Sequence, residues 1–142
     1  MQEYITLRKT WYDNELTELK VVCSSTLITA SAEIYINDRL IDELVHQLRH
    51  FLNGDVTETC WANTTKGDDS VTCVAFRFMH KDKLGHIWIE VYMELDDGGK
   101  YSEHNCCFYI NTEMGQLEEF CKKILILKEK RLWTEVTLND EC

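Results

Sequence analysis

The 142-residue chain contains no proline and only six glycines. Proline and glycine are the residues that most often build linkers and irregular loops. Their scarcity excludes a long flexible linker, and no change in composition divides the chain. The residues are 44% hydrophobic, so a chain of this length can bury one core. We therefore predict a single domain that spans residues 1–142.

Long hydrophobic runs are also missing from the sequence. Ile124–Leu127 is a typical apolar run, far short of the roughly 20 apolar residues that a membrane helix needs. The opening residues MQEYITLRKTW include an acid and no extended apolar region, so they do not match a secretory signal. We expect a cytoplasmic protein that has no membrane partner.

Positive charge is scarce in this chain. Lysine and arginine total 15 against 25 aspartates and glutamates, which gives a formal net charge of −10. The phosphates of nucleic acid would repel such a chain, so we predict no nucleic-acid partner. The charge favours solubility and attraction to a basic protein partner. Many bacterial cytosolic proteins are acidic without such a partner, so both interpretations stay open.

Sequence motifs of common catalytic sites are absent as well. The chain has no G-x-S-x-G, no phosphate-binding loop and no G-x-G-x-x-G. Its carboxylate pairs occur in predicted turns or on predicted surfaces, where nothing indicates an apolar pocket that would shift a pKa. We therefore predict no catalytic residue and no cofactor, and we expect a protein that is not an enzyme.

Cysteine and histidine are present but not in metal-site patterns. The seven cysteines fit no zinc spacing, so we interpret them as small apolar residues with free thiols. Cys60 and Cys73 lie symmetrically about Lys66-Gly67, so the spacing allows a disulfide across a hairpin, which a reducing cytosol opposes. His46 and His50 are four residues apart on the polar face of a predicted helix, without further ligands. We predict no metal site.

Several segments alternate between inward apolar residues and outward residues, which predicts half-buried strands. In Ile87–Leu95 every odd-numbered residue is aliphatic, and the even-numbered residues are Trp, Glu, Tyr and Glu. Leu27–Ile36, Val71–His80 and Ser102–Ile110 show the same alternation. Short turn sequences such as KGDDS and DDGGK separate these runs, and YDNE and SST divide the N-terminal third into three strands.

Two segments have a helical period instead. The first has an apolar stripe from Leu40 to Leu52, with Asp38 as its predicted N-cap and Asn53-Gly54 as its stop. The second has a stripe from Leu117 to Leu127, with Thr112 as its predicted N-cap.

The tripeptide Tyr-Ile-Asn precedes both predicted helices, at residues 35–37 and 109–111. We predict that each copy closes a strand and leads into a capped helix. An internal duplication and two independent choices of similar caps both explain the repeat.

The order of elements predicts an α+β fold. Three strands, a helix, four strands and a second helix give the order βββαββββα. We predict an antiparallel sheet of about seven strands with both amphipathic helices packed on one face.

The other face of that predicted sheet would carry aromatic and acidic residues, namely Tyr35, Trp88, Glu90, Tyr92, Glu94 and Tyr109. Aromatic anchors surrounded by charge are typical of protein interfaces. Strand propensity and cross-strand pairing explain the same residues without a partner. A second predicted contact region is the pair of acidic loops with Asp68, Asp69, Asp96 and Asp97, which ordinary turn chemistry also explains.

The order of these motifs resembles the small WapI-type immunity proteins of bacterial polymorphic toxin systems and their uncharacterised relatives. The resemblance is carried by three stretches: YINDRLIDELVHQLRHFLNG, FRFMHKDKLGHIWIEVYMEL and FYINTEMGQLEEFCKKIL. It covers residues 3–130 and leaves the tail RLWTEVTLNDEC outside.

This resemblance implies a non-enzymatic protein that neutralises a cognate toxin domain by stoichiometric binding. It implies no particular contact residues. A basic toxin domain would suit the acidic chain, because opposite charges accelerate association. The alternative is a structural or regulatory interaction module that forms a homodimer, so the sequence leaves monomer and homodimer open.

Overall fold

A computed structural model of the chain describes residues 3–64, 72–95 and 104–139. The elements in these ranges are β1 (Tyr4–Tyr12), β2 (Thr17–Ser24), β3 (Thr29–Ile36), α1 (Asp38–Leu52), β4 (Glu58–Ala62), β5 (Cys73–His80), β6 (His86–Leu95), β7 (His104–Glu113), α2 (Met114–Ile124), the 3-10 helix η1 (Leu125–Lys128) and β8 (Glu135–Leu138). The α+β class, with two helices and antiparallel strands, is confirmed, but the predicted order βββαββββα is not matched exactly because the described chain has eight strands. The tail adds β8, which was not predicted.

The strands form two antiparallel sheets, so the prediction of one sheet of about seven strands was wrong. The first sheet has the order β3-β2-β1-β8, and the second has the order β4-β5-β6-β7. The physical reason is that β3 and β4, which α1 connects, do not pair with each other. Strand β4 pairs with the next strand, β5, and β8 returns to pair with β1, so the groups β1–β3 and β5–β7 belong to separate sheets.

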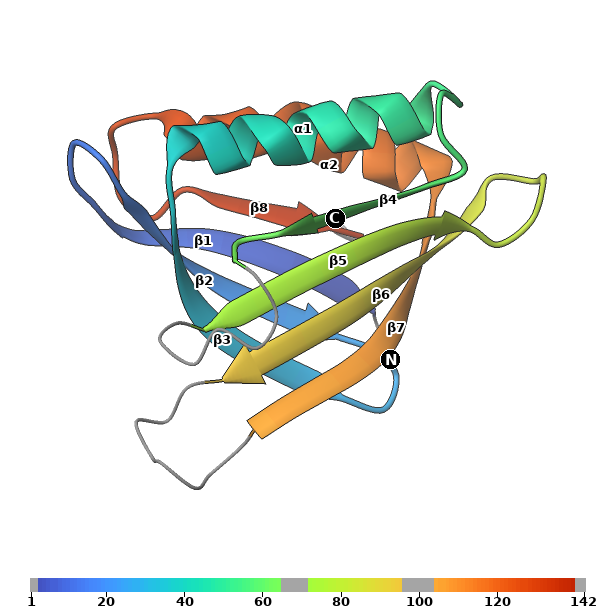
Figure 1. Cartoon of the computed structure of the whole chain (residues 1–142), viewed down its shortest axis with the longest axis horizontal. Helices are drawn as coiled ribbons and strands as arrows, with labels where there is room; N and C mark the ends of the chain where they lie inside the picture. Colours follow the sequence, from blue (N-terminus) through green and yellow to red (C-terminus); the bar gives the residue numbers. More distant parts are fainter. Residues whose placement is uncertain (1–2, 65–71, 96–103, 140–142) are drawn as a thin grey trace.

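The helices lie side by side along one side of both sheets, as Figure 1 shows. Helix α1 contacts β4, and α2 contacts β8. On the far side of the core, β3 of the first sheet crosses β5 and β6 of the second. The two inner sheet faces and the two helices therefore enclose one core, instead of two helices covering one face of a single sheet.

The predicted inward residues form this core. In β6 the side chains of Ile87, Ile89, Val91 and Met93 are fully buried, which confirms the alternation predicted for this strand. The apolar stripes of both helices are buried too: Ile41, Leu44, Val45, Leu48 and Phe51 in α1, and Leu117, Phe120, Cys121 and Ile124 in α2. Burial of each large aliphatic or aromatic side chain stabilises the fold by about 1.5–3 kcal/mol.

The predicted start of each helix is displaced by one residue. Asn37, not Asp38, is the N-cap of α1, because its side-chain oxygen accepts a hydrogen bond from the amide of Leu40 at 2.9 Å. The predicted stop is confirmed: Asn53 is the C-cap, and Gly54 has φ +80°.

The second Tyr-Ile-Asn does not close its strand, because β7 continues to Glu113. Glu113 is the N-cap of α2 and makes no side-chain capping bond. The prediction of Thr112 as the cap was wrong, since its hydroxyl lies 2.6 Å from the side-chain oxygen of Asn139 and donates to it.

The chain folds as two similar halves that exchange their last strands. Each half runs strand, strand, strand, helix, strand, and β4 pairs with β5 while β8 pairs with β1. The two Tyr-Ile-Asn motifs occupy equivalent places, because Tyr35 lies opposite Glu18 on β2 and Tyr109 lies opposite Glu90 on β6. The repeat in the sequence therefore corresponds to a repeat in the topology.

An asparagine follows the last strand of each half and secures it in the same way. The side-chain amide of Asn63 donates to the carbonyl of Thr72 at 2.8 Å, just before β5. The side-chain amide of Asn139 donates to the carbonyl of Glu3 at 3.1 Å, just before β1. Asn139 also donates to the carbonyl of Asn111 in β7 at 2.9 Å, so it joins the first sheet to the second.

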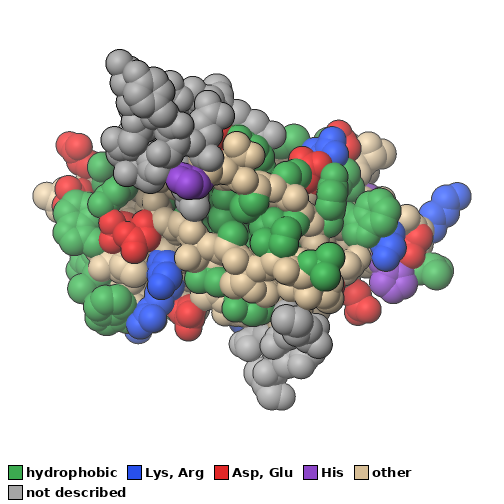
Figure 2. Space-filling model, turned by 90° about the horizontal axis from the view of Figure 1, so that it is seen from below, with side chains coloured by type: hydrophobic (Ala, Val, Ile, Leu, Met, Phe, Trp, Pro, Cys, Tyr) green, Lys and Arg blue, Asp and Glu red, His purple; other side chains and the backbone are tan. Residues whose placement is uncertain are grey.

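Strands β3 and β7 lie on the side of the molecule away from the helices (Figure 1). Figure 2 views this side directly. Hydrophobic and uncharged atoms cover the middle of the visible surface, and most of the charged side chains lie toward its two ends.

Candidate interaction surface

Five of the six predicted interface residues on strands gather on the outer face of the second sheet. Trp88, Glu90, Tyr92 and Glu94 alternate with the buried residues of β6, and Tyr109 lies beside them on β7. Trp88 is 41% exposed and Tyr109 is 48% exposed. With Arg77 of β5, these residues define what we call the aromatic–acidic face.

Glu90 holds the centre of the aromatic–acidic face together. The register places Arg77, Glu90 and Tyr109 in one row across β5, β6 and β7. One oxygen of Glu90, Oε2, accepts from the Arg77 guanidinium at 3.0 Å and from the Tyr109 hydroxyl at 3.0 Å. The Glu90 carboxylate raises the pKa of Arg77 through its charge and that of Tyr109 through the hydrogen bond.

Tyr92 and Glu94 form a second polar pair on the same strand. The Tyr92 hydroxyl donates to a carboxylate oxygen of Glu94 at 2.6 Å. This bond favours the neutral phenol, and partial burial adds to it, so the pKa of Tyr92 is raised to about 12. Both tyrosines of the aromatic–acidic face are thus fixed by carboxylates in defined orientations.

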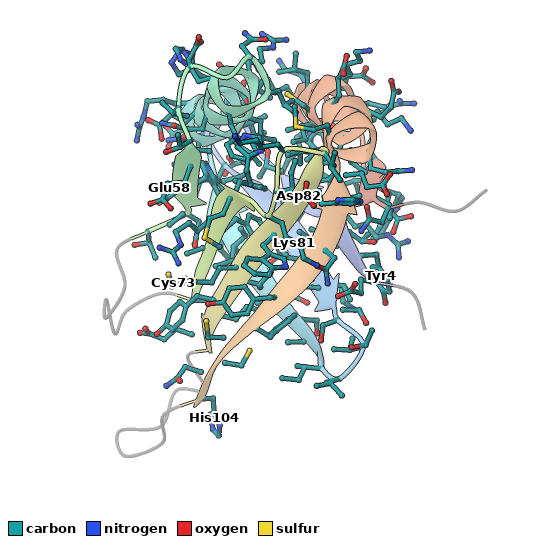
Figure 3. The ribbon with its side chains drawn as sticks, turned by 90° about the vertical axis from the view of Figure 1, so that its right-hand side faces the viewer. Tyr4, Glu58, Cys73, Lys81, Asp82 and His104 are labelled. Carbon is teal, nitrogen blue, oxygen red and sulfur yellow. The ribbon has the colours of Figure 1, made fainter. Side chains whose placement is uncertain are left out.

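Trp88 lies at the end of the aromatic–acidic face nearest the β5–β6 turn. Its ring centroid is 6.5 Å from that of Tyr109, with the planes inclined by 59°. The ammonium of Lys81 lies 5.4 Å from the Trp88 ring centroid, a cation–π distance. Figure 3 shows Lys81 beside Asp82 at the upper end of the second sheet. The tryptophan is therefore oriented by neighbours on two sides while much of it stays exposed.

A hollow of about 290 Å³ lies next to these residues on β4, β5 and β6. The register places Ala62 opposite Ala75 and Ala75 opposite Tyr92, so two small side chains form its floor. Arg77, Glu90 and Tyr92 line its edge. On the outer face of the second sheet, aromatic side chains therefore project next to a hollow that is large enough for one side chain of a partner.

Tyr35 is the exception, because it lies on the other sheet. The prediction of one shared outer face was therefore wrong for this residue. Tyr35 is 54% exposed on β3 and packs against Trp11, with ring centroids 6.2 Å apart. A hydrogen bond with Glu18 raises its pKa. The first sheet thus carries an aromatic and acidic cluster of its own.

Sequence reasoning missed Trp11 and Trp133 on that first sheet. Trp11 faces outward because a β-bulge between Lys9 and Trp11 inserts an extra residue and reverses the alternation. Trp133 precedes β8 in the unpredicted tail, and the guanidinium of Arg8 lies 5.1 Å from its ring. The run WTEVTL, which alternates over only a few residues, was the one signal for this part of the sheet.

The acidic loops cannot be placed relative to the aromatic–acidic face. Asp68, Asp69, Asp96 and Asp97 lie outside the described residues. The prediction that they contact a partner stays a prediction.

Neither cysteine nor histidine forms a site in the described ranges. Cys60 lies opposite Arg77 and Cys73 lies opposite Glu94, so the two cysteines do not face each other across the β4–β5 pair. The ring centroids of His46 and His50 lie 4.4 Å apart with the planes inclined by 60°, and Nδ1 of His50 lies 3.3 Å from a carboxylate oxygen of Asp55. Over residues 3–64, 72–95 and 104–139, no cluster of three or more histidines, cysteines and carboxylates is arranged to hold a metal.

Comparison with known proteins leaves the family undetermined. No family model, curated protein or solved structure matches the chain. The resemblance to WapI-type immunity proteins therefore stays a prediction. None of the described helices is long and apolar enough to cross a membrane.

Proposed function

We propose that this protein is a non-enzymatic binding module of the immunity type, which neutralises a toxin domain by stoichiometric binding. The observation that carries the proposal is the aromatic–acidic face. Two aromatic rings project there beside a recess, and carboxylates fix the tyrosines before any partner arrives. Preorganised aromatic side chains lose little conformational freedom on binding, so they are favoured anchors in interfaces.

Charge supports a basic partner. The chain has a net charge of −10, and the aromatic–acidic face contains Glu90 and Glu94 against the single cation Arg77. A basic domain would be attracted at long range, and its association rate would fall as salt screens the charges. Neutralisation would follow from covering the partner's active surface, with no turnover by this chain.

The first experiment is an affinity capture of the tagged protein from its native cell, at low and at high salt, with the eluate identified by mass spectrometry. We expect one basic companion in equal amount, released or weakened by salt. The purified companion alone should be toxic when expressed, and co-expression of this chain should protect the host.

The aromatic–acidic face is then tested by Trp88→Ala and Tyr92→Ala. Truncation of an aromatic side chain that anchors an interface costs about 2 kcal/mol or more, which is roughly 30-fold in Kd. The matched control is Trp11→Ala, because Trp11 is 44% exposed against 41% for Trp88 but lies on the other sheet. We expect the control to bind as the wild type does.

Two results would contradict this proposal. Recovery of the protein alone at every salt concentration, in several growth phases, would show that it has no stable protein partner in that cell. Equal loss of binding in Trp88→Ala and Trp11→Ala would show that the aromatic–acidic face is not the specific contact surface. Thermal unfolding of each variant separates loss of binding from loss of fold.

A further inference from the structure

The outer face of the first sheet carries three exposed aromatic side chains, which we call the aromatic row. Trp11 of β1 is 44% exposed, Tyr35 of β3 is 54% exposed, and Trp133, just before β8, is 59% exposed. The strand order β3-β2-β1-β8 makes β3 and β8 the edges of this sheet (Figure 1). Neighbouring strands lie about 4.8 Å apart, so the aromatic row crosses roughly 14 Å of sheet surface.

Backbone irregularities bring both tryptophans to this face. Trp11 follows the bulge in β1. On the other side of β1, Lys9 donates to the carbonyl of Thr134 and accepts from the amide of Trp133, both at 2.9 Å. Two residues of the tail thus oppose one residue of β1, which is the pattern of a second bulge.

Trp133 occupies the position of this bulge that glycine usually takes. Its φ is +67°, and a bulky side chain is rare in this left-handed conformation because the backbone is strained there. Burial of the ring does not explain the strain, since more than half of the side chain is exposed. Strain that packing does not explain is typical of functional sites.

The side chains of the aromatic row are oriented by their neighbours. The ring centroids of Trp11 and Tyr35 lie 6.2 Å apart, with the planes inclined by 75°. Glu18 lies opposite both residues in the register and forms a hydrogen bond with Tyr35. The Arg8 guanidinium lies 5.1 Å from the ring centroid of Trp133. Oriented rings lose little conformational freedom when a ligand binds.

A line of four exposed charged residues crosses the sheet beside the aromatic row. The register places these residues opposite one another in the order Glu33, Lys20, Arg8 and Glu135. The two central residues donate hydrogen bonds and the two outer residues accept them. Their charges sum to zero, so they favour neither an anion nor a cation. The chain as a whole, at −10, repels anions.

We infer that the aromatic row binds a neutral β-1,4-linked glycan. Such a ligand is uncharged, and its hydroxyl groups both donate and accept hydrogen bonds, as the line of charged residues requires. The C–H faces of its sugar rings are flat and apolar, so they can stack on the exposed aromatic rings. The β-1,4 linkage keeps the chain extended and flat, which suits the surface of a sheet. This inference does not depend on the proposed binding of a toxin domain.

Isothermal titration of the full chain with cellohexaose and with chitohexaose tests the inference. We expect saturable binding whose Kd is the same at low and high salt, because the ligand has no charge to screen. Trp11→Ala and Trp133→Ala should each raise the Kd at least tenfold, since each removes a stacking surface. The matched control is Trp88→Ala, which removes an equally exposed tryptophan from the other sheet and should bind the glycans as the wild type does.

Trp133→Gly separates a role in binding from a role in stability. Glycine adopts a positive φ without strain, so this variant should unfold at the same temperature as the wild type or higher. Its affinity for the glycans should nevertheless fall at least tenfold. A Trp133→Gly variant that binds them as tightly as the wild type would overturn the inference.

A decaproline peptide is the competing probe. It is also uncharged and extended, and proline-rich segments bind to exposed aromatic side chains. Binding of decaproline in place of both glycans would overturn the inference. So would the absence of binding heat with either glycan up to about 5 mM, or a Kd that rises steeply with salt.

The same two variants separate this inference from the proposed function. Trp11→Ala should lose the glycan and keep the basic protein partner. Trp88→Ala should lose the protein partner and keep the glycan. Each proposal can therefore fail while the other stands.

Discussion

At the scale of single residues, the pair of Tyr92 and Glu94 links the geometry of the aromatic–acidic face to a measurable titration. The Tyr92 phenol donates to a carboxylate and is partly buried, which raises its pKa from the usual 10.0 to about 12. Between these two values the folded protein keeps a proton on Tyr92 that the unfolded chain releases. The stability from this bond is thus present below pH 10.0 and is lost as pH rises through about 12.

The unfolding free energy of the wild type should fall between pH 10 and 12, because the folded state holds the Tyr92 proton longer than the unfolded chain does. We predict that Tyr92→Phe makes this fall less steep, by up to about 1.4 kcal/mol per pH unit, the value for one proton. Urea unfolding at several pH values measures this slope. The control is Glu94→Gln, which keeps the shape of residue 94 and removes its charge. In that variant the ultraviolet titration of tyrosinate should show Tyr92 closer to its ordinary pKa. An unchanged titration would contradict the assignment.

The directions of these side chains could be predicted from the sequence, but their partners could not. A strand has a period of two, so the alternation of β6 was enough to place Trp88, Glu90 and Tyr92 on its outer face. The contact of Glu90 with Arg77 and Tyr109 depends on the register of three strands. Residue types alone do not set that register.

Lys9 shows the limit of residue-level prediction most clearly. It is only 2% exposed, although it is a lysine in a strand. Its ammonium donates to the carbonyls of Leu127 and Glu129 at the end of η1 and lies 4.4 Å from the Tyr12 ring. Burial lowers its pKa. This lysine closes the end of a helix that is remote in sequence, and no local pattern indicates such a contact.

At the scale of elements, the two helix starts differ in a way that can be measured. The Asn37 side chain caps α1, whereas Glu113 begins α2 without a side-chain capping bond. We predict that Asn37→Ala lowers the unfolding free energy by about 1 kcal/mol, the usual cost of losing a polar N-cap. Urea denaturation measures the change.

Glu113→Ala is the matched control for that variant. It removes the N-cap residue of the other helix, where no capping bond is lost, and should cost less than about 0.5 kcal/mol. Equal losses in the two variants would show that the difference in capping geometry does not matter for stability.

The elements themselves were largely predictable, because long runs with a clear period specify their own structure. Strands β5 and β6 and the apolar stripes of both helices were placed correctly. The β8 strand was missed because it has only four residues, too few to establish a period. Its stability comes from pairing with β1, a contact between the two ends of the described chain.

At the scale of the whole molecule, Asn139 joins β8, the start of β1 and β7. Its amide donates to the carbonyls of Glu3 and Asn111, and its side-chain oxygen accepts from Thr112. Its backbone has φ +62°, a left-handed conformation that asparagine tolerates better than most residues.

We predict that Asn139→Ala lowers the unfolding free energy by about 2–3 kcal/mol, because three hydrogen bonds are lost and alanine is strained at this φ. Asn139→Gly removes the same hydrogen bonds without the strain, so it should cost about 1 kcal/mol less than the alanine variant. Thermal and urea unfolding compare the two variants. A glycine variant as stable as the wild type would show that the amide does not join the sheets.

The arrangement in two sheets could not be predicted from local patterns. Alternation identifies a strand and its buried face, but it does not say which strand is its neighbour. The exchange of β4 and β8 between the two halves decides the architecture, and both strands are short. Tyr35 was therefore assigned to the aromatic–acidic face, although it lies on the opposite sheet.

The pairing of β1 with β8 also determines the order in which the molecule is completed during synthesis. Ile5 pairs with Leu138, so β1 leaves the ribosome long before its partner β8. Until then one edge of β1 has no partner, and the N-terminal half cannot finish its sheet on its own. The second sheet has all four of its strands once β7 has emerged. The nascent chain should therefore complete its second sheet first, and the final pairing of β8 with β1 carries the entropy cost of closing a long loop.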